Sequence, residues 1–196
     1  MIIGIDFDNT IANYTGVFHQ VALALDWIPQ KIGRTKTDVK NYFINQNQEA
    51  KWTELQGIVY GKEIYQARPY KGCIQVLKEL KAQGNMLYLV SHKTRYPIIG
   101  EKVDFHRAAI AWLQINDLIG SEQAPFSLDT LFFNETLQSK VNKVAELKCH
   151  VFIDDLEKVL LHQDFPSNCT GILFNPLASI ANYSTATCWA EVSHLL

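Results

Sequence analysis

Short apolar runs recur along the chain and alternate with segments in which apolar residues fall three or four positions apart. Continuous apolar runs predict buried strands of a parallel sheet, because such strands are covered on both faces. These runs lie at residues 2–7, 86–90, 128–133, 150–153 and 172–174. Helical spacing follows at residues 72–83, 103–113 and 140–147. We therefore predict an α/β protein with a parallel sheet of about five strands and helices on both faces.

Residues 14–66 break this alternation because no convincing strand is found there. Helical spacing recurs instead in three segments, which are residues 16–25, residues 37–44 and the stretch containing Trp52, Leu55 and Val59. The glycines of the last segment, Gly57 and Gly61, would permit close packing against a neighbour. A structureless connection of this length is unusual. We therefore predict a core domain of residues 1–13 and 69–196 with a helical cap insert of residues 14–68.

The composition narrows the class of protein. The chain is 47% hydrophobic and 19% charged, with a formal net charge of −2. This balance argues against nucleic acid as a partner, because phosphate neutralisation requires an excess of cations. The longest apolar run, residues 108–113, is far shorter than the roughly 18 residues of a membrane span. No secretory signal is present, so we expect a cytoplasmic protein that has no membrane partner.

Cysteine and histidine spacing indicates neither a disulfide framework nor a zinc site. The four cysteines form no CxxC pair, and the six histidines show no HxxxH or HExxH spacing. We expect reduced, mostly buried thiols.

Acidic, hydroxyl and ammonium side chains stand where the predicted strands end or a later helix begins. They are Asp6, Asp8, Ser91, Asp154 and Asp155 at strand ends, and Lys140 at a helix start. Taken singly, each has a structural explanation as a turn, a helix cap or a solvated surface residue. The carboxyl ends of parallel strands share one sheet edge, where open α/β sheets build active sites. Together these residues predict one site.

Their order resembles the four motifs of the haloacid dehalogenase (HAD) superfamily of phosphohydrolases. The DxDxT motif reads Asp6-Phe7-Asp8-Asn9-Thr10, and the second motif is the apolar strand that ends in Ser91. The third motif, a lysine, is best matched by Lys140, with Lys143 as the alternative, and the fourth is Asp154-Asp155. Asn9 stands where many members have glycine, and both residues tolerate turn conformations. The resemblance spans roughly residues 1–175 and implies a HAD-like, Rossmann-like sheet with the Asp6 strand in its centre.

The resemblance also implies roles for these residues in a Mg²⁺-dependent phosphatase. Asp6 would be the nucleophile and Asp8 the general acid and base. The phosphoryl group would be held by Lys140, the Ser91 hydroxyl and main-chain N–H groups near Phe7 and His92. Mg²⁺ would bind Asp6, the main-chain carbonyl of Asp8, Asp154 and Asp155, because carboxylates facing a phosphate dianion require a cation.

The substrate is expected to be a small phosphorylated metabolite, and both a nucleotide and a sugar phosphate remain open. We expect the insert to act as a lid. Its Trp52 and Tyr60, together with Lys93 and Arg95 after the second motif, are candidate substrate contacts.

Other functions use similar residues. A phosphotransferase or mutase would form the same aspartyl-phosphate, whereas a metal-free dehalogenase would not need Asp8 or the Asp154-Asp155 pair. In a receiver domain, the aspartate that accepts the phosphoryl group lies on a middle strand. Here the best candidate, Asp6, lies on the first strand, before a long insert. A non-catalytic ligand-binding relative is the remaining alternative.

Overall fold

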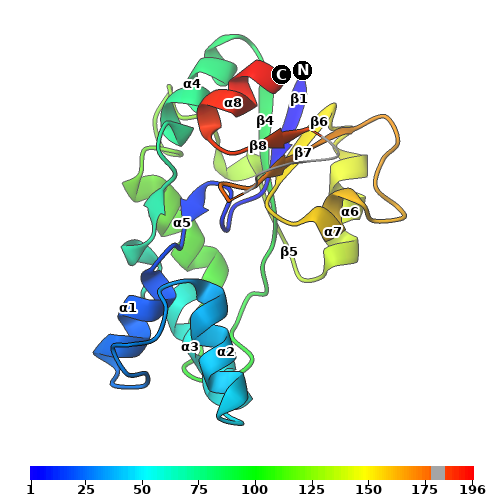
Figure 1. Cartoon of the computed structure of the whole chain (residues 1–196). Coiled ribbons are helices and arrows are strands. Elements are labelled where there is room, and N and C mark those ends of the chain that lie inside the picture. Colours follow the sequence, from blue (N-terminus) through cyan, green and yellow to red (C-terminus); the bar gives the residue numbers. More distant parts are fainter. Residues whose placement is uncertain (178–183) are drawn as a thin grey trace. The chain divides into compact units, whose positions relative to one another are not determined.

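The computed structural model describes residues 1–177 and 184–196 (Figure 1). Its main sheet has six strands in the order β5-β4-β1-β6-β7-β8, and neighbouring strands run parallel. The strands are β1 (Ile2–Ile5), β4 (Met86–His92), β5 (Leu131–Asn134), β6 (Val151–Asp154), β7 (Thr170–Phe174) and β8 (Thr185–Ala186). The predicted α/β class and parallel sheet are confirmed.

Strand β1 lies inside the sheet, between β4 and β6. Ile3 pairs in register with Leu87 of β4 and with Val151 of β6. Ile3, Gly4 and Ile5, which alternate between the two faces of the sheet, are all buried, as expected for a strand that is covered on both faces. The carboxyl ends of these three strands therefore meet at one edge of the sheet.

Helices cover both faces of this sheet. Figure 1 shows α4 (Cys73–Ala82) with α8 (Trp189–Leu195) on one side, and α6 (Leu137–Glu146) with α7 (Glu157–Leu160) on the other. Beneath α6 and α7, Val141, Val144 and Val159 pack with Val90 and Phe152 in one apolar cluster. This packing fixes α6 against the strands that end at the predicted site.

The contacts within the chain divide it into two compact units. One unit contains residues 1–12, 69–93 and 113–196, and the other contains residues 13–68 and 94–112. The helices of the second unit are α1 (Val17–Ala24), α2 (Lys36–Asn45), α3 (Glu49–Tyr60) and most of α5 (Phe105–Ile115), with a 3₁₀ turn, η1 (Ile64–Gln66). Strands β2 (Ala12–Asn13) and β3 (Arg68–Pro69) pair where the chain leaves the first unit and returns.

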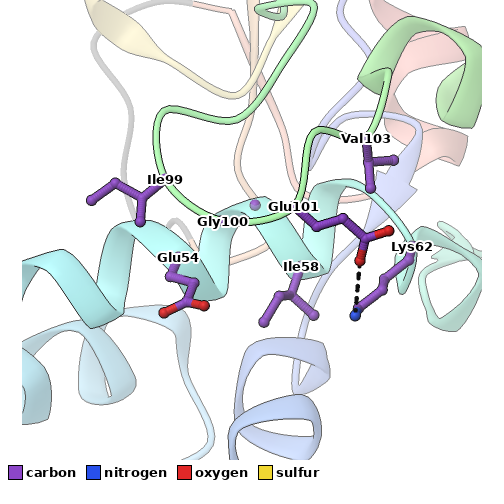
Figure 2. A pocket seen from close by; sticks show the side chains of 8 residues that line it. Glu54, Ile58, Lys62, Ile99, Gly100, Glu101 and Val103 are labelled. Carbon is purple, nitrogen blue, oxygen red and sulfur yellow. Dashed lines mark hydrogen bonds and ion pairs between the residues drawn. The ribbon is translucent and has the colours of Figure 1, made fainter.

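Residues 94–112, which the sequence pattern alone assigned to the core, pack on helix α3 of the insert. Figure 2 shows the segment from Ile99 to Val103 running along α3, with Glu101 3.5 Å from Lys62. A Cβ atom on Gly57 would lie 3.0 Å from the Pro97 side chain and 3.1 Å from the Ile99 carbonyl oxygen. The close packing predicted for the α3 glycines is thus present.

Two features of the main sheet also differ from the sequence pattern. Residues Leu128–Thr130 form a 3₁₀ turn, η2, rather than the start of a strand, because the Thr130 hydroxyl accepts a hydrogen bond from the Ser127 main-chain N–H and closes the turn. Strand β8 was not predicted, since two residues carry no periodicity. Within the described residues, no helix has the length and apolar character needed to cross a membrane.

Candidate active site

The loop after β1 turns sharply and carries both aspartates of the first motif. The Phe7 carbonyl oxygen accepts hydrogen bonds from the N–H groups of Ile11 and Ala12, at 3.0 and 2.9 Å. Asn9 adopts a left-handed conformation with φ of 60°, which asparagine tolerates better than most non-glycine residues. Asn9 therefore adopts the left-handed turn conformation for which glycine would be the favoured residue.

Helix α6 delivers Lys140 to this loop. Thr136 caps the helix by accepting a hydrogen bond from the Ser139 N–H, which places Lys140 in the first turns. The buried Lys140 ammonium lies 2.6 Å from Asp6 Oδ1 and 2.6 Å from Asp154 Oδ2. Lys143, the alternative match, instead pairs with Glu146 of the same helix at 2.6 Å.

Three carboxylates gather around Lys140. One oxygen from each of Asp6, Asp154 and Asp155 lies within 4.8 Å of the others. Burial raises the pKa of Asp6 to about 7 and that of Asp155 to about 8, against an ordinary value of 3.8, and the neighbouring carboxylates add to both increases. Burial alone would lower the pKa of Lys140, but Asp6 and Asp154 outweigh it and raise that pKa.

This cluster fits a magnesium ion. Its ligand atoms are carboxylate oxygens, which Mg²⁺ prefers. Three carboxylates against one ammonium leave excess negative charge in a buried place. The raised pKa values of Asp6 and Asp155 reflect first this burial and then the charge of the neighbouring carboxylates. A divalent cation would remove this cost.

Ser91 contributes a buried hydroxyl at the end of β4. The Ser91 side chain is 1% exposed, and its Oγ has no hydrogen-bond partner among the described residues. An unsatisfied buried hydroxyl costs free energy, so this group is suited to a ligand. The Ser91 carbonyl oxygen accepts a 3.1 Å hydrogen bond from Asn134 Nδ2.

Sequence reasoning missed Asn134, which lies buried at the end of β5 beside Ser91. Its carbonyl oxygen accepts a 2.9 Å hydrogen bond from the Lys93 N–H. The sequence did offer a signal, because Asn134 is a polar residue directly after the apolar run of β5, as polar residues are at the other strand ends.

The segment after Ser91 places Lys93, a candidate substrate contact, beside Asp8 of the first motif. Lys93 Nζ lies 2.8 Å from Asp8 Oδ2, and its side chain is only 3% exposed. His92 is the last residue of β4, and its Nε2 lies 3.3 Å from the Glu135 carbonyl oxygen.

The remaining candidate substrate contacts belong to the second unit. Trp52 is buried there, with its ring centroid 5.3 Å from that of Phe18. The Tyr60 hydroxyl accepts a 2.8 Å hydrogen bond from Lys36 Nζ, and Arg95 pairs with Asp104 at 3.0 Å.

No protein-family model matches the sequence, and no curated protein is similar to it. Solved structures do share its fold. A HAD-superfamily hydrolase of subfamily IA from Geobacter sulfurreducens is 10% identical with a TM-score of 0.60, over 100% of this chain and 95% of that chain. A predicted phosphoglycolate phosphatase from Haemophilus somnus is 14% identical with a TM-score of 0.57, over 99% and 96%. A dehalogenase is 9% identical with a TM-score of 0.58, over 100% and 96%. The fold is that of HAD-superfamily hydrolases.

Proposed function

We propose that this protein is a Mg²⁺-dependent phosphatase that hydrolyses a small phosphomonoester, such as a nucleotide or a sugar phosphate, through an aspartyl-phosphate on Asp6. The observation that carries the proposal is the Lys140 ammonium, which contacts both Asp6 and Asp154 at 2.6 Å. A buried carboxylate with a cation beside it and the unpaired Ser91 hydroxyl nearby in the fold suit an incoming phosphoryl group.

In the first step, a carboxylate oxygen of Asp6 attacks the phosphorus atom and the bond to the leaving oxygen breaks. Asp8 gives a proton to that oxygen, so the product leaves as a neutral alcohol. Lys140 and Ser91 bind the phosphoryl oxygens, whose negative charge must be held throughout the transfer.

In the second step, water attacks the phosphorus atom of the aspartyl-phosphate. Asp8 takes a proton from this water, and the bond between phosphorus and the Asp6 oxygen breaks. Inorganic phosphate is released, and both aspartates return to their starting protonation states.

Asp6, Asp154 and Asp155 would hold Mg²⁺ with the main-chain carbonyl of Asp8. When bound, the ion supplies positive charge that lets the Asp6 carboxylate approach a phosphate dianion.

The main alternative is carbon–halogen hydrolysis, since one of the similar structures is a dehalogenase. That reaction requires a nucleophilic aspartate but not a metal-binding group of carboxylates. The cluster of Asp6, Asp154 and Asp155 therefore favours phosphoryl transfer. A phosphotransferase or mutase would follow the same first step and then accept another hydroxyl in place of water. A non-catalytic relative would not need the contact between the Lys140 ammonium and the Asp6 carboxylate.

The test is phosphate release from 4-nitrophenyl phosphate with Mg²⁺ or with EDTA. We expect activity with Mg²⁺ only, and its loss in Asp6→Asn, because an amide is neither a nucleophile nor an anionic ligand. Asp129→Asn, at an exposed position, is the matched control and should retain full activity. Beryllium fluoride should bind the wild type, but not Asp6→Asn, in ¹⁹F NMR. Metal-independent halide release from 2-chloropropionate, or full turnover by Asp6→Asn, would contradict the proposal.

A further inference from the structure

Resting on the proposed function, we propose that Asn134 is a positioning residue whose side-chain amide fixes the main chain at Ser91, so that the Ser91 hydroxyl is held in place for the phosphoryl group. Both residues belong to the same compact unit. They lie near the carboxyl ends of two neighbouring parallel strands, β5 and β4, where His92 and Asn134 are paired in register. Asn134 acts through Ser91 and does not itself touch the substrate.

The Asn134 amide bridges two main-chain carbonyls. Its Nδ2 donates to the Ser91 carbonyl oxygen on β4 at 3.1 Å and to the Phe132 carbonyl oxygen on its own strand at 3.3 Å. Carbonyl oxygens only accept hydrogen bonds, so the nitrogen of the amide, and not its oxygen, must face them. Asn134 is 8% exposed, which removes most of the water that could compete for these contacts. The side chain therefore connects β5 to β4 at Ser91.

The Ser91 hydroxyl depends on the main chain that carries it. Its Oγ is buried and has no hydrogen-bond partner among the described residues, so no side-chain contact holds it in place. A serine hydroxyl is separated from the main chain by one rotatable bond, and a shift of the main chain moves the oxygen with it. Hydrogen bonds weaken steeply when their geometry is lost. Fixing the Ser91 main chain thus fixes the contact that Ser91 makes with a phosphoryl oxygen.

The main chain of Asn134 holds the next part of the segment independently of the amide. The Asn134 carbonyl oxygen accepts a 2.9 Å hydrogen bond from the Lys93 N–H. A substitution of the Asn134 side chain leaves this main-chain hydrogen bond in place. Such a variant therefore tests the amide at Ser91 without removing the main-chain contact at Lys93.

The loss of the amide should weaken phosphate binding rather than turnover. Ser91 contacts phosphoryl oxygens in the bound substrate and throughout the transfer, and the loss of such uniform binding raises KM with little change in kcat. A purely structural defect would instead reduce the number of active molecules, which lowers the apparent kcat at an unchanged KM. The two explanations therefore predict different kinetic changes.

The first experiment measures the binding of inorganic phosphate in the presence of Mg²⁺ by isothermal titration calorimetry. Asn134→Leu keeps a branched side chain of similar size but has no donor. We expect it to weaken phosphate binding about tenfold, as the loss of one neutral hydrogen bond does. Ser91→Ala should cause a similar loss. Adding Asn134→Leu to Ser91→Ala should cost less than about twofold more, because both changes remove the same contact. Additive losses would overturn the inference.

Asn85→Leu is the matched control. Asn85 stands directly before β4, at the opposite end of the strand, and is 9% exposed. Its Nδ2 donates a buried 2.9 Å hydrogen bond to the Leu80 carbonyl oxygen. Asn85→Leu should lower the free energy of unfolding in urea and leave phosphate binding unchanged. An equal loss of phosphate affinity in this control would contradict a specific role for Asn134. Asn134→Ala should reproduce the result of Asn134→Leu and replaces it should that variant not fold.

Steady-state kinetics with 4-nitrophenyl phosphate give the second readout. In Asn134→Leu, KM should rise about tenfold while kcat stays within about twofold of the wild type. A fall in kcat at unchanged KM would contradict positioning. A wild type that binds phosphate with the expected coupling but hydrolyses no phosphomonoester would reject only the proposed function. An active wild type with additive losses would reject only the role of Asn134, and a wild type that binds no phosphate would overturn that role as well.

Discussion

The indole N–H of Trp189 donates a 3.0 Å hydrogen bond to the carbonyl oxygen of Thr10, which lies 179 positions earlier. Trp189 is completely buried at the start of α8, and its ring lies 5.8 Å from that of Phe174. Helix α8 is thereby tied to the loop that carries Asp6 and Asp8.

Trp189→Phe should destabilise the protein and disturb the site. The substitution leaves the buried Thr10 carbonyl unpaired, which costs about 1–3 kcal/mol. The melting temperature should fall by about 2–4 °C for each kcal/mol. Urea unfolding measures the first effect, and kcat with 4-nitrophenyl phosphate should fall as well. Trp112→Phe is the matched control, because Trp112 makes a similar buried hydrogen bond to Ala67 in the second unit. It should lower stability alone, and an equal fall in kcat would show that the Trp189 contact has no special effect on the site.

Lys140→Met should abolish turnover and destabilise the metal-free protein. Removing one partner of a buried ion pair typically costs about 3–5 kcal/mol, here because Asp6 and Asp154 lose their shared cation. The free energy of unfolding in urea with EDTA measures this loss, and Mg²⁺ should restore part of it.

Lys143→Met tests the alternative assignment of the third motif. Lys143 pairs with Glu146, whose side chain is 67% exposed, and such pairs contribute at most about 1 kcal/mol. We expect near wild-type activity and stability. Loss of turnover in this variant would transfer the catalytic assignment from Lys140 to Lys143.

The stability of the metal-free protein should fall as the pH rises. Burial raises the pKa of Asp6 to about 7 and that of Asp155 to about 8, above the ordinary 3.8. Between about pH 4 and 8, the folded protein then binds more protons than the unfolded chain. The stabilising contribution of each protonated carboxyl group is therefore lost as the pH rises through this window. The lowered pKa of His92, caused mainly by burial, acts in the opposite direction.

Comparing the wild type with Asp155→Asn isolates the contribution of the Asp155 carboxyl group to the pH dependence of stability. In urea unfolding at pH 5, 7 and 9 with EDTA, the variant should show a smaller decline. Saturating Mg²⁺ at about 100 times its dissociation constant should add about 2.7 kcal/mol to the wild type. A wild-type stability that rises from pH 5 to 9 in EDTA would contradict the raised pKa values.

Thiol reactivity should distinguish one cysteine from the other three. Cys188 is exposed, whereas Cys73, Cys149 and Cys169 are buried. Burial also raises the pKa of Cys149 to about 11 and of Cys169 to about 12, which suppresses their thiolate forms. Ellman's reagent should modify one thiol in the native protein and four in denaturant. Cys188→Ser should remove the fast reaction, and a second fast thiol would contradict the burial.

The local pattern of apolar residues predicted those strands that are buried along most of their length. Strands β1, β4 and β6 are covered on both faces, so their apolar runs were visible without any knowledge of their neighbours. The helices of the insert were visible for a different reason, since buried apolar residues recur at helical spacing in α1, α2 and α3.

Contacts between distant segments could not be predicted in this way. Lys93 stands among polar residues and was a candidate substrate contact, and only the structure reveals that it is buried against Asp8. Trp189 acts through the Thr10 main-chain carbonyl, which leaves no trace in a sequence pattern. The contact of Asn134 with the Ser91 carbonyl was marked only by a polar residue at the end of an apolar run. Trp52 was a candidate for substrate contact because it is aromatic, but only packing could reveal its place beside Phe18.

The interior position of β1 has a consequence for synthesis on the ribosome. This strand emerges well before β4 and β6, between which it finally lies. Asp6 meets its cation only after 134 further residues have been translated. The nascent chain therefore carries β1 without its neighbour β6, and Asp6 without its cation, for most of its elongation. A chain that stops before Trp189 lacks α8, and with it the hydrogen bond that ties this helix to the loop carrying Asp6 and Asp8.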